Sequence, residues 1–168
     1  MRRFLLALAL VPVTACGPGE PPGNSSIALE RDFADYRAWP SYVLEPGPDG
    51  GDIDPAHTSN PRTVYINHVP DAGVAAFPEG TLIVKESPFN LFAMGKRGGE
   101  YNAAGAKGWE WFELLRDEST GRVTIKWRGL GPPAGESYAE AGQTCNACHG
   151  LYAVNDSVMS APLQVVRR

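Results

Sequence analysis

Two cysteines and a histidine near the carboxyl end of the chain are spaced for covalent attachment of a haem. The stretch Cys145-Asn146-Ala147-Cys148-His149 has the form C-x-x-C-H, which is the attachment signature of a c-type haem. Two thiols about one helical turn apart can each add across a vinyl group of one porphyrin, and the next residue can supply an imidazole nitrogen to the iron. The sequence therefore predicts one haem c, anchored by Cys145 and Cys148 and ligated by His149.

Two other kinds of site contain a C-x-x-C pair. A structural zinc site takes four ligands, but the chain has no second cysteine pair, and its remaining histidines, His57 and His68, are isolated in the sequence. A thioredoxin-like pair opens a helix after a strand in a βαβ unit, whereas this pair lies near the end of a helix-like segment. Both alternatives fit the motif less well than haem attachment does.

The composition places the chain among ordinary globular domains. Its 168 residues suffice for one domain with an apolar core. The formal net charge of −4 argues against a nucleic-acid partner. We read no internal repeat and no second composition regime, so one domain over residues 29–168 is expected.

The first residues resemble a bacterial export signal of the lipoprotein type. Arg2 and Arg3 precede an apolar run that is too short to span a bilayer. The run ends in Val13-Thr14-Ala15-Cys16, which looks like a lipobox. We expect residues 1–15 to be removed, Cys16 to be acylated and residues 16–28 to form a Pro/Gly-rich tether. An ordinary cleaved signal is the alternative. Since haem c is attached on the exported side of the membrane, both motifs predict a periplasmic, lipid-anchored protein.

Hydrophobic periodicity predicts an α+β fold, with a central antiparallel sheet and flanking helices. The Ser137 to Glu140 segment matches a capping box, so a helix that carries the haem motif is expected to run from there to Gly150. The apolar tail, 158–166, should pack back on the domain. A first helix is expected over 29–39, and strands over 42–44, 62–67, 81–86, 91–94, 109–115 and 122–127.

Several segments together resemble one family. The resemblance rests on Asp35-Tyr36-Arg37-x-Trp39, Arg62-Thr63-Val64-Tyr65, Phe77-x-x-Gly80-Thr81-x-x-x-Lys85-Glu86, Gly108-Trp109 and the terminal Cys145-x-x-Cys148-His149. In these segments the chain is similar to the cytochrome P-460 / cytochrome c′-beta family, over roughly residues 31 to 162. Members of that family are exported mono-haem proteins with a mainly β fold, and they are usually homodimers.

The resemblance implies roles for further residues. Lys85 matches the lysine that cross-links to the porphyrin edge in the P-460 branch, and Arg62 matches a pocket arginine. Hydroxylamine-oxidising members have a proton-accepting glutamate near the place taken here by Leu91-Phe92. An apolar Phe92 there implies a dry distal pocket, similar to the c′-beta branch, which binds nitric oxide at five-coordinate iron. Nothing in the sequence aims Glu86 or Glu100 at the iron.

These expectations lead to one function and two alternatives. We expect a small nitrogen-oxide ligand, nitric oxide or hydroxylamine, at an open axial position, with a cytochrome as redox partner and an oxidoreductase activity that the sequence leaves undecided. The first alternative is an electron-transfer cytochrome c in which Met94 or Met159 is the second ligand. The second is a lipoprotein whose haem is only structural. A ligand role for His57, which lies in a Gly/Pro-rich loop, is the weaker interpretation of that residue.

Overall fold

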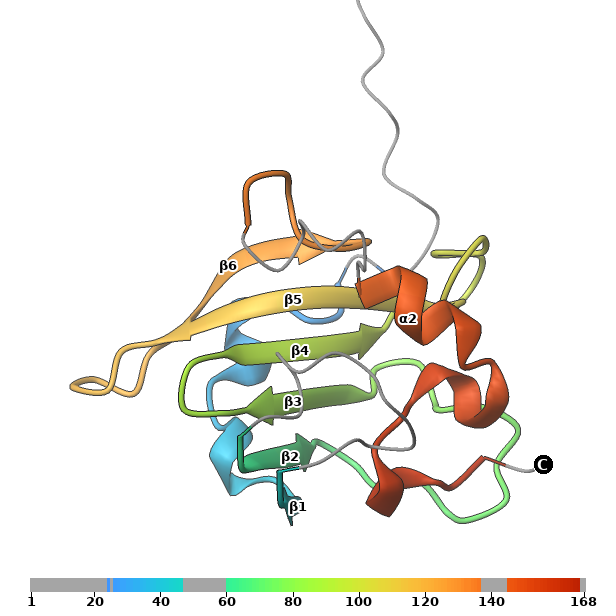
Figure 1. The fold of residues 1–168 in the computed structure, drawn as a ribbon, viewed down its shortest axis with the longest axis horizontal. Helices are drawn as coiled ribbons and strands as arrows, with labels where there is room; N and C mark the ends of the chain where they lie inside the picture. Colours follow the sequence, from blue (N-terminus) through green and yellow to red (C-terminus); the bar gives the residue numbers. More distant parts are fainter. Residues whose placement is uncertain (1–23, 25, 47–59, 137–144, 167–168) are drawn as a thin grey trace, which may run out of the picture.

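Six antiparallel strands form one sheet whose spatial order follows the chain, β1-β2-β3-β4-β5-β6 (Figure 1). The structure is a computed structural model, and it describes residues 24, 26–46, 60–136 and 145–166. The strands are β1 (Ser41–Leu44), β2 (Arg62–Ile66), β3 (Leu82–Glu86), β4 (Leu91–Lys96), β5 (Trp109–Arg116) and β6 (Val123–Gly129). All six were expected, with ends that differ by at most two residues. The sheet confirms the α+β expectation.

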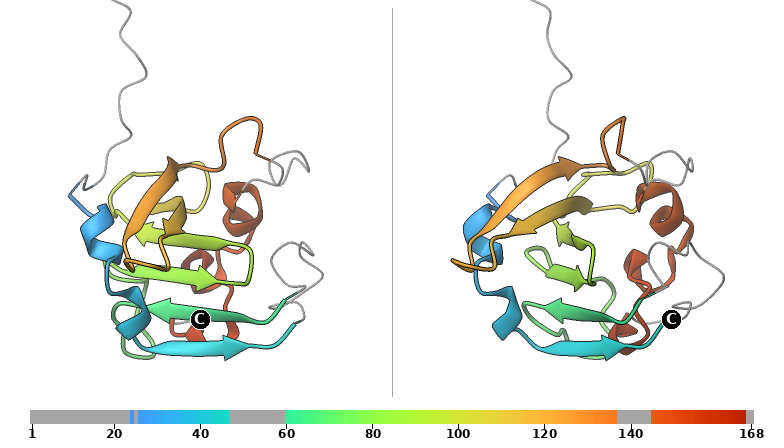
Figure 2. Two further views of the ribbon diagram at one scale, coloured as in Figure 1. Left: turned by 90° about the vertical axis from the view of Figure 1, so that its left-hand side faces the viewer. Right: turned by 60° about the vertical axis from the view of Figure 1, so that its left-hand side comes forward.

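Alternation along the strands gives the sheet two apolar faces. Successive side chains of a strand point to opposite sides, so each of the central strands contributes to two separate cores. One core contains Val64, Ile66, Ile83, Met94 and Trp111, and the other contains Leu82, Val84, Ala93, Phe112 and Leu114. The C-terminal segment, which contains helix α2 (Cys145–Leu151), covers the first side, and we call this side the α2 face. The N-terminal segment covers the second side, which we call the η face (Figure 2).

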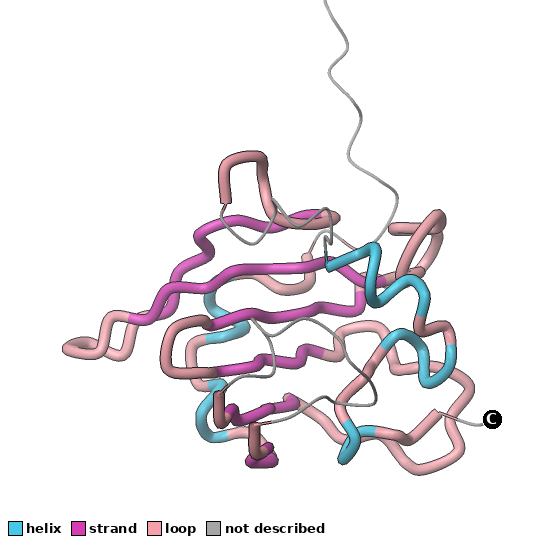
Figure 3. Tube along the Cα trace, in the orientation of Figure 1, coloured by secondary structure: helices cyan, strands magenta, loops and turns pink. Residues whose placement is uncertain are grey.

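The expected first helix, 29–39, is wrong in type. The segment instead forms two short 3-10 helices, η1 (Glu30–Phe33) and η2 (Tyr36–Ala38) (Figure 3). Asp35, with φ −109° and ψ 26°, interrupts the helical path between them. Phe33 is the last residue of η1 and Tyr36 the first of η2. Both are buried on the η face, where Phe33 lies 5.4 Å from the ring of Phe112.

The C-terminal segment packs on the α2 face, as expected. It consists of α2 (Cys145–Leu151), η4 (Val154–Ser157) and η5 (Ala161–Leu163). Val158 and Leu163 are buried in the core, and Val166 makes a parallel bridge with Val74. The expected start of the motif helix, Ser137 to Glu140, lies outside the described residues.

The end of the expected tether is part of the packed domain. Ala28 is fully buried, and its carbonyl accepts a hydrogen bond from Arg128 Nη1 at 3.2 Å. The same Arg128 pairs with Glu110, and Glu110 also pairs with the buried Arg97. Arg97 Nε in turn donates to the Asn24 carbonyl at 3.2 Å. These buried charges are therefore satisfied by one another and by the incoming chain.

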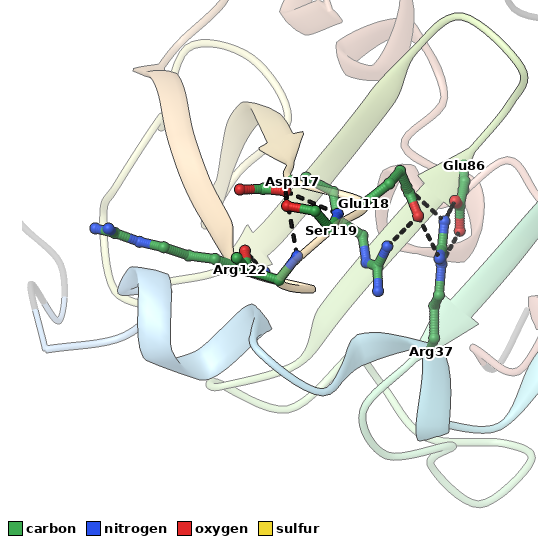
Figure 4. A network of polar contacts seen from close by, with 8 residues as sticks. Arg37, Glu86, Asp117, Glu118, Ser119 and Arg122 are labelled. Atoms are coloured by element: carbon green, nitrogen blue, oxygen red, sulfur yellow. Dashed lines mark hydrogen bonds and ion pairs between the residues drawn. The ribbon is translucent and has the colours of Figure 1, made fainter.

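A network of ion pairs closes one end of the η face (Figure 4). The guanidinium of Arg37, in η2, contacts both carboxylate oxygens of Glu86 on β3 and reaches Glu118 at 3.2 Å. Burial raises the pKa of Glu86, but the hydrogen bonds from Arg37 and nearby tyrosines outweigh burial and lower it below its usual value. The network ties η2 to the sheet and to the β5–β6 turn.

We predict that Glu86→Gln destabilises the protein at neutral pH by about 1 kcal/mol. A carboxyl group whose folded-state pKa is lowered stabilises the fold above its unfolded-state pKa of 4.5 and loses that contribution as the pH falls through the folded-state pKa. The difference between variant and wild type should therefore shrink below about pH 4.5. Urea unfolding at a series of pH values measures it.

The matched control is Glu100→Gln. Glu100 pairs with Lys107 on the open surface, with 66% and 60% of the two side chains exposed, so the change should have little effect at any pH. A difference at Glu86 that stays constant from pH 7 to pH 3 would contradict the assignment.

Candidate functional site

Helix α2 presents the three residues of the haem motif on neighbouring positions of its surface. Residues three and four apart lie on the same side of a helix, and Cys148 and His149 follow Cys145 by three and four. The two cysteines are not joined in a disulfide. Cys145 packs against the apolar core of the α2 face. Cys145 and Cys148 thus lie on one side of the helix.

A polar contact with the β4–β5 loop docks the start of α2. The Oδ1 atom of Asn146, between the two cysteines, accepts hydrogen bonds from Asn102 Nδ2 at 2.6 Å and from the Ala106 backbone N–H at 3.0 Å. Asn102 has a left-handed backbone, with φ 54°, and also donates to the carbonyls of Ala106 and Trp109. Gly105 leaves room for this contact, because a Cβ there would overlap the Asn146 amide.

His149 is held as a neutral imidazole with a defined tautomer. Its Nδ1 lies 2.8 Å from the carbonyl oxygen of Ser157. Because a carbonyl only accepts, Nδ1 carries the hydrogen and Nε2 keeps the lone pair that a metal needs. Burial lowers the pKa of His149 to about 4; the bond to Ser157 opposes this shift, and the positive charge of Lys85 adds to it. The ring packs 4.4 Å from that of Trp111 on β5.

A row of side chains crosses the α2 face beside the motif. The strand register pairs Val64 with Lys85, Lys85 with Phe92, Phe92 with Glu113 and Glu113 with Trp127. Paired residues of neighbouring strands project to the same side. The next row, Ile66-Ile83-Met94-Trp111, is apolar. Its last residue, Trp111, contacts the ring of His149.

The structure brings the expected pocket residues to this one face. Lys85 Nζ lies 6.0 Å from the centre of the Phe92 ring. The Lys85 charge also lowers the pKa of Cys145, although burial is the larger effect and raises that pKa to about 11. Arg62 is 2% exposed, shares its face of β2 with Val64 and donates Nη1 to the Glu45 carbonyl at 3.0 Å. Two further expected residues, Cys16 and His57, lie outside the described residues.

Glu113 is a site residue that the sequence analysis missed. Glu113 is 9% exposed, and its carboxylate accepts a hydrogen bond from Trp127 Nε1 at 2.9 Å and forms an ion pair with Lys126 Nζ at 3.0 Å. It stands opposite Phe92 in the register, so a carboxylate lies beside the side chain from which a dry pocket was expected. Alternation from Trp109 and Trp111 would have placed Glu113 on the same side.

The two carboxylates that lie near Leu91-Phe92 in the sequence, Glu86 and Glu100, are placed elsewhere. Glu86 follows Lys85 directly and so points to the η face, where it pairs with Arg37. Glu100 is on the surface with Lys107. Neither contributes to the α2 face.

The α2 face contains a buried hydrogen-bond donor without an acceptor. Trp111 is 4% exposed, and its buried Nε1 finds no hydrogen-bond acceptor within the described residues. Leaving such a donor unsatisfied costs about 1–3 kcal/mol, so an acceptor from a bound group would relieve it. Across the described ranges, no three His, Cys, Asp or Glu side chains are grouped to hold a metal ion. A haem needs only one such ligand, since the porphyrin supplies four nitrogens.

We predict that Gly105→Ala destabilises the protein by roughly 1–3 kcal/mol, the usual cost of forcing atoms into a packed site. The new Cβ must displace the Asn146 amide and with it the docking of α2. Thermal unfolding of Gly105→Ala, Asn146→Ala and the double variant measures the effect.

The double variant is the control. Truncating the side chain of Asn146 to a methyl group leaves space for the Cβ introduced at Gly105, so the combined loss should be smaller than the sum of the two single losses. Strictly additive losses would show that Gly105 does not act through Asn146.

Comparison with known proteins leaves these residues as the basis for any assignment. No protein-family model, curated protein or solved structure matches the chain. Function must therefore be argued from the helix, the face that it covers and the groups between them.

Proposed function

We propose that the protein is an exported c-type haem protein that binds or oxidises small nitrogen oxides, such as nitric oxide or hydroxylamine, at an open axial position. One observation carries the proposal. Helix α2 carries Cys145, Cys148 and His149 within five residues, Cys145 packs on the apolar core, and the ring of His149 contacts Trp111. His149 is neutral, and its Nε2 lone pair is unshared by the Ser157 bond. A haem c held by these residues would supply an iron that His149 ligates and that can bind a small ligand.

Each residue around the motif has its own role in holding a haem. Cys145 and Cys148 are the thioether anchors and His149 is the iron ligand. Arg62, Lys85 and the Trp111 N–H present positive charge and a donor, which suit the carboxylates at the edge of a porphyrin. Lys85 is also the residue that would form a cross-link of the P-460 type, and Phe92 lies beside it as an apolar wall.

Glu113 is the group that decides between binding and oxidation. Oxidation of hydroxylamine releases protons, so a base near the bound ligand speeds it. Lys126 Nζ and Trp127 Nε1 donate hydrogen bonds to the Glu113 carboxylate and so fix the orientation of its oxygens. A carboxylate on this face adds support for turnover.

An electron-transfer cytochrome stays the second candidate, because Met94 lies on the α2 face. It pairs with Trp111 in the register and is 7% exposed, packed among apolar side chains. A methionine that fills a core in this way is poorly placed to turn toward an iron. Met159 is half-buried in the C-terminal tail.

The proposal includes a lipid anchor at Cys16, which lies outside the described residues. The helices that the structure describes include none long and apolar enough to cross a membrane. A periplasmic location on a bacterial membrane, a cytochrome as redox partner and a homodimer are further parts of the proposal that rest on the sequence resemblance.

We predict that the protein made with haem-maturation machinery is coloured and carries one haem through two thioethers. Absorption should be that of high-spin five-coordinate iron, whereas a low-spin six-coordinate spectrum would favour the methionine-ligated alternative. Intact mass reports the haem, any extra bond from Lys85 and acylation of Cys16. Cys148→Ala should leave at most one thioether, and His149→Ala should change the spectrum.

The control for the ligand assignment is His68→Ala, since His68 is exposed, and its spectrum should be that of the wild type. A colourless wild-type protein would contradict the proposal. A soluble mature protein that begins at a residue other than Cys16 would contradict the lipid anchor.

We predict that Glu113→Gln lowers hydroxylamine oxidation by about 10²-fold or more, the usual contribution of a positioned base, while nitric oxide still binds. Stopped-flow oxidation and nitric oxide titration of the holoprotein measure the two effects. Glu136→Gln is the matched control, because Glu136 pairs with the same Lys126 at 2.9 Å from outside the sheet. Equal loss in both variants would show that the charge on Lys126, and not a base, is responsible.

A further inference from the structure

Three consecutive residues of η4, just before the apolar tail, have a left-handed backbone. The φ angles of Asn155, Asp156 and Ser157 are 56°, 53° and 67°, and none of them is glycine. L-residues rarely adopt this conformation, and a run of three is disfavoured at every step. Such a turn persists only where the surrounding structure holds it, and it is often found where geometry matters for function.

The side chain of Asp156 holds the turn from two elements of the domain. Its Oδ1 accepts an ion pair from Lys96 Nζ at 2.7 Å, and its Oδ2 accepts the Phe77 backbone N–H at 2.9 Å. Its carbonyl oxygen accepts the indole N–H of Trp109 at 2.7 Å. Lys96 is fixed in turn by the Lys107 carbonyl at 2.9 Å and by the Trp109 ring, 4.9 Å away.

Asn155 joins the turn to the rest of the tail. Its Nδ2 donates to the carbonyls of Val158 and Leu163 at 2.7 and 2.9 Å, and its Oδ1 accepts the Val166 backbone N–H at 3.0 Å. Asn155 is 6% exposed. The turn is thus fixed to the sheet through Asp156 and to the tail through Asn155.

These contacts fix the position of one carbonyl group, that of Ser157. The Ser157 oxygen lies 2.8 Å from His149 Nδ1, and Ser157 is 5% exposed. That bond decides which nitrogen of His149 carries the hydrogen. It also fixes the rotation of the ring, which Trp111 contacts on one side. A shift of the Ser157 carbonyl would free both the tautomer and the orientation of the His149 ring.

We propose that Asp156 is a positioning residue for His149: by holding the left-handed turn 155–157 to Lys96 and Phe77, it aims the Ser157 carbonyl at Nδ1 and keeps Nε2 as the nitrogen that binds metal. The inference rests on the proposed function only where His149 takes up an iron. The tautomer and the ring orientation are properties of the polypeptide itself.

The first measurement uses the protein without haem. Imidazole ¹⁵N spectra at neutral pH, assigned with His149→Ala, should show the wild-type ring with hydrogen on Nδ1. In Asp156→Asn the ring should become a mixture of both tautomers, because an amide has one acceptor oxygen and cannot accept from both Lys96 and the Phe77 N–H. Asp71→Asn, the same change in an exposed turn, should leave the ring unchanged. This arm tests the inference even if no haem attaches.

The second measurement uses the holoprotein. The iron–histidine stretch in the resonance Raman spectrum of the ferrous form should move to lower frequency in Asp156→Asn, because a weaker Nδ1 hydrogen bond makes Nε2 a weaker donor. Asp71→Asn should keep the wild-type frequency. An ion pair that serves only stability would lower the melting temperature and move neither the tautomer nor the stretch.

A double variant covers the case in which Asp156→Asn does not fold. Lys96→Met/Asp156→Asn removes both charges, so no unpaired buried charge remains, and it should fold and show the same tautomer mixture. A double variant with hydrogen only on Nδ1 overturns the inference. An iron–histidine stretch that keeps the wild-type frequency in Asp156→Asn or in the double variant also overturns the inference. Haem that fails to attach to wild type would count against the proposed function alone.

Discussion

The structure depends on the docking of one short helix. Helix α2 has seven residues, and an isolated helix of that length has no stability of its own in water. Its contacts with the domain therefore determine whether Cys145, Cys148 and His149 have a fixed geometry. Asn146 supplies the contact at one end and His149 supplies the one at the other, through the Ser157 carbonyl. The motif is thus positioned by residues that lie inside it, and the polypeptide alone sets the relation of both thiols to the imidazole.

The sheet separates this site from the contacts that hold the domain together. Lys85 and Glu86 are neighbours in sequence, yet Lys85 faces α2 and Glu86 pairs with Arg37 on the η face. Trp111 and Glu110 are also neighbours that lie on opposite faces. Trp111 contacts His149, and Glu110 is enclosed by Arg97 and Arg128. A shift of one residue in register would exchange these roles. The bonds of the η face therefore protect the site indirectly, by fixing the register of the strands beneath it.

The sequence analysis succeeded where local chemistry repeats along the chain, and failed where the chain folds around distant partners. The strands were predictable because each is rich in β-branched or aromatic residues and most are bounded by turn residues. The first helix was misjudged because the spacing of Leu29, Phe33 and Tyr36 carries no signal for the break at Asp35. Glu113 was missed because each face of the strand from Trp109 to Leu115 carries one glutamate among apolar residues, so that alternation did not single out a polar side. The left-handed turn at Asp156 has no local signal, since the contacts that hold it come from Lys96 and Phe77.

Two unusual features of the α2 face meet at His149, and this supports a functional role for that residue without using the motif. A run of left-handed L-residues costs roughly 1–2 kcal/mol per residue, and a buried N–H without an acceptor costs about 1–3 kcal/mol. The first feature ends at the carbonyl that binds His149, and the second, Trp111 Nε1, belongs to the ring in contact with it. Features that lower stability are kept where a ligand or a reaction requires them. Their convergence on His149 identifies the same imidazole that the C-x-x-C-H spacing selects.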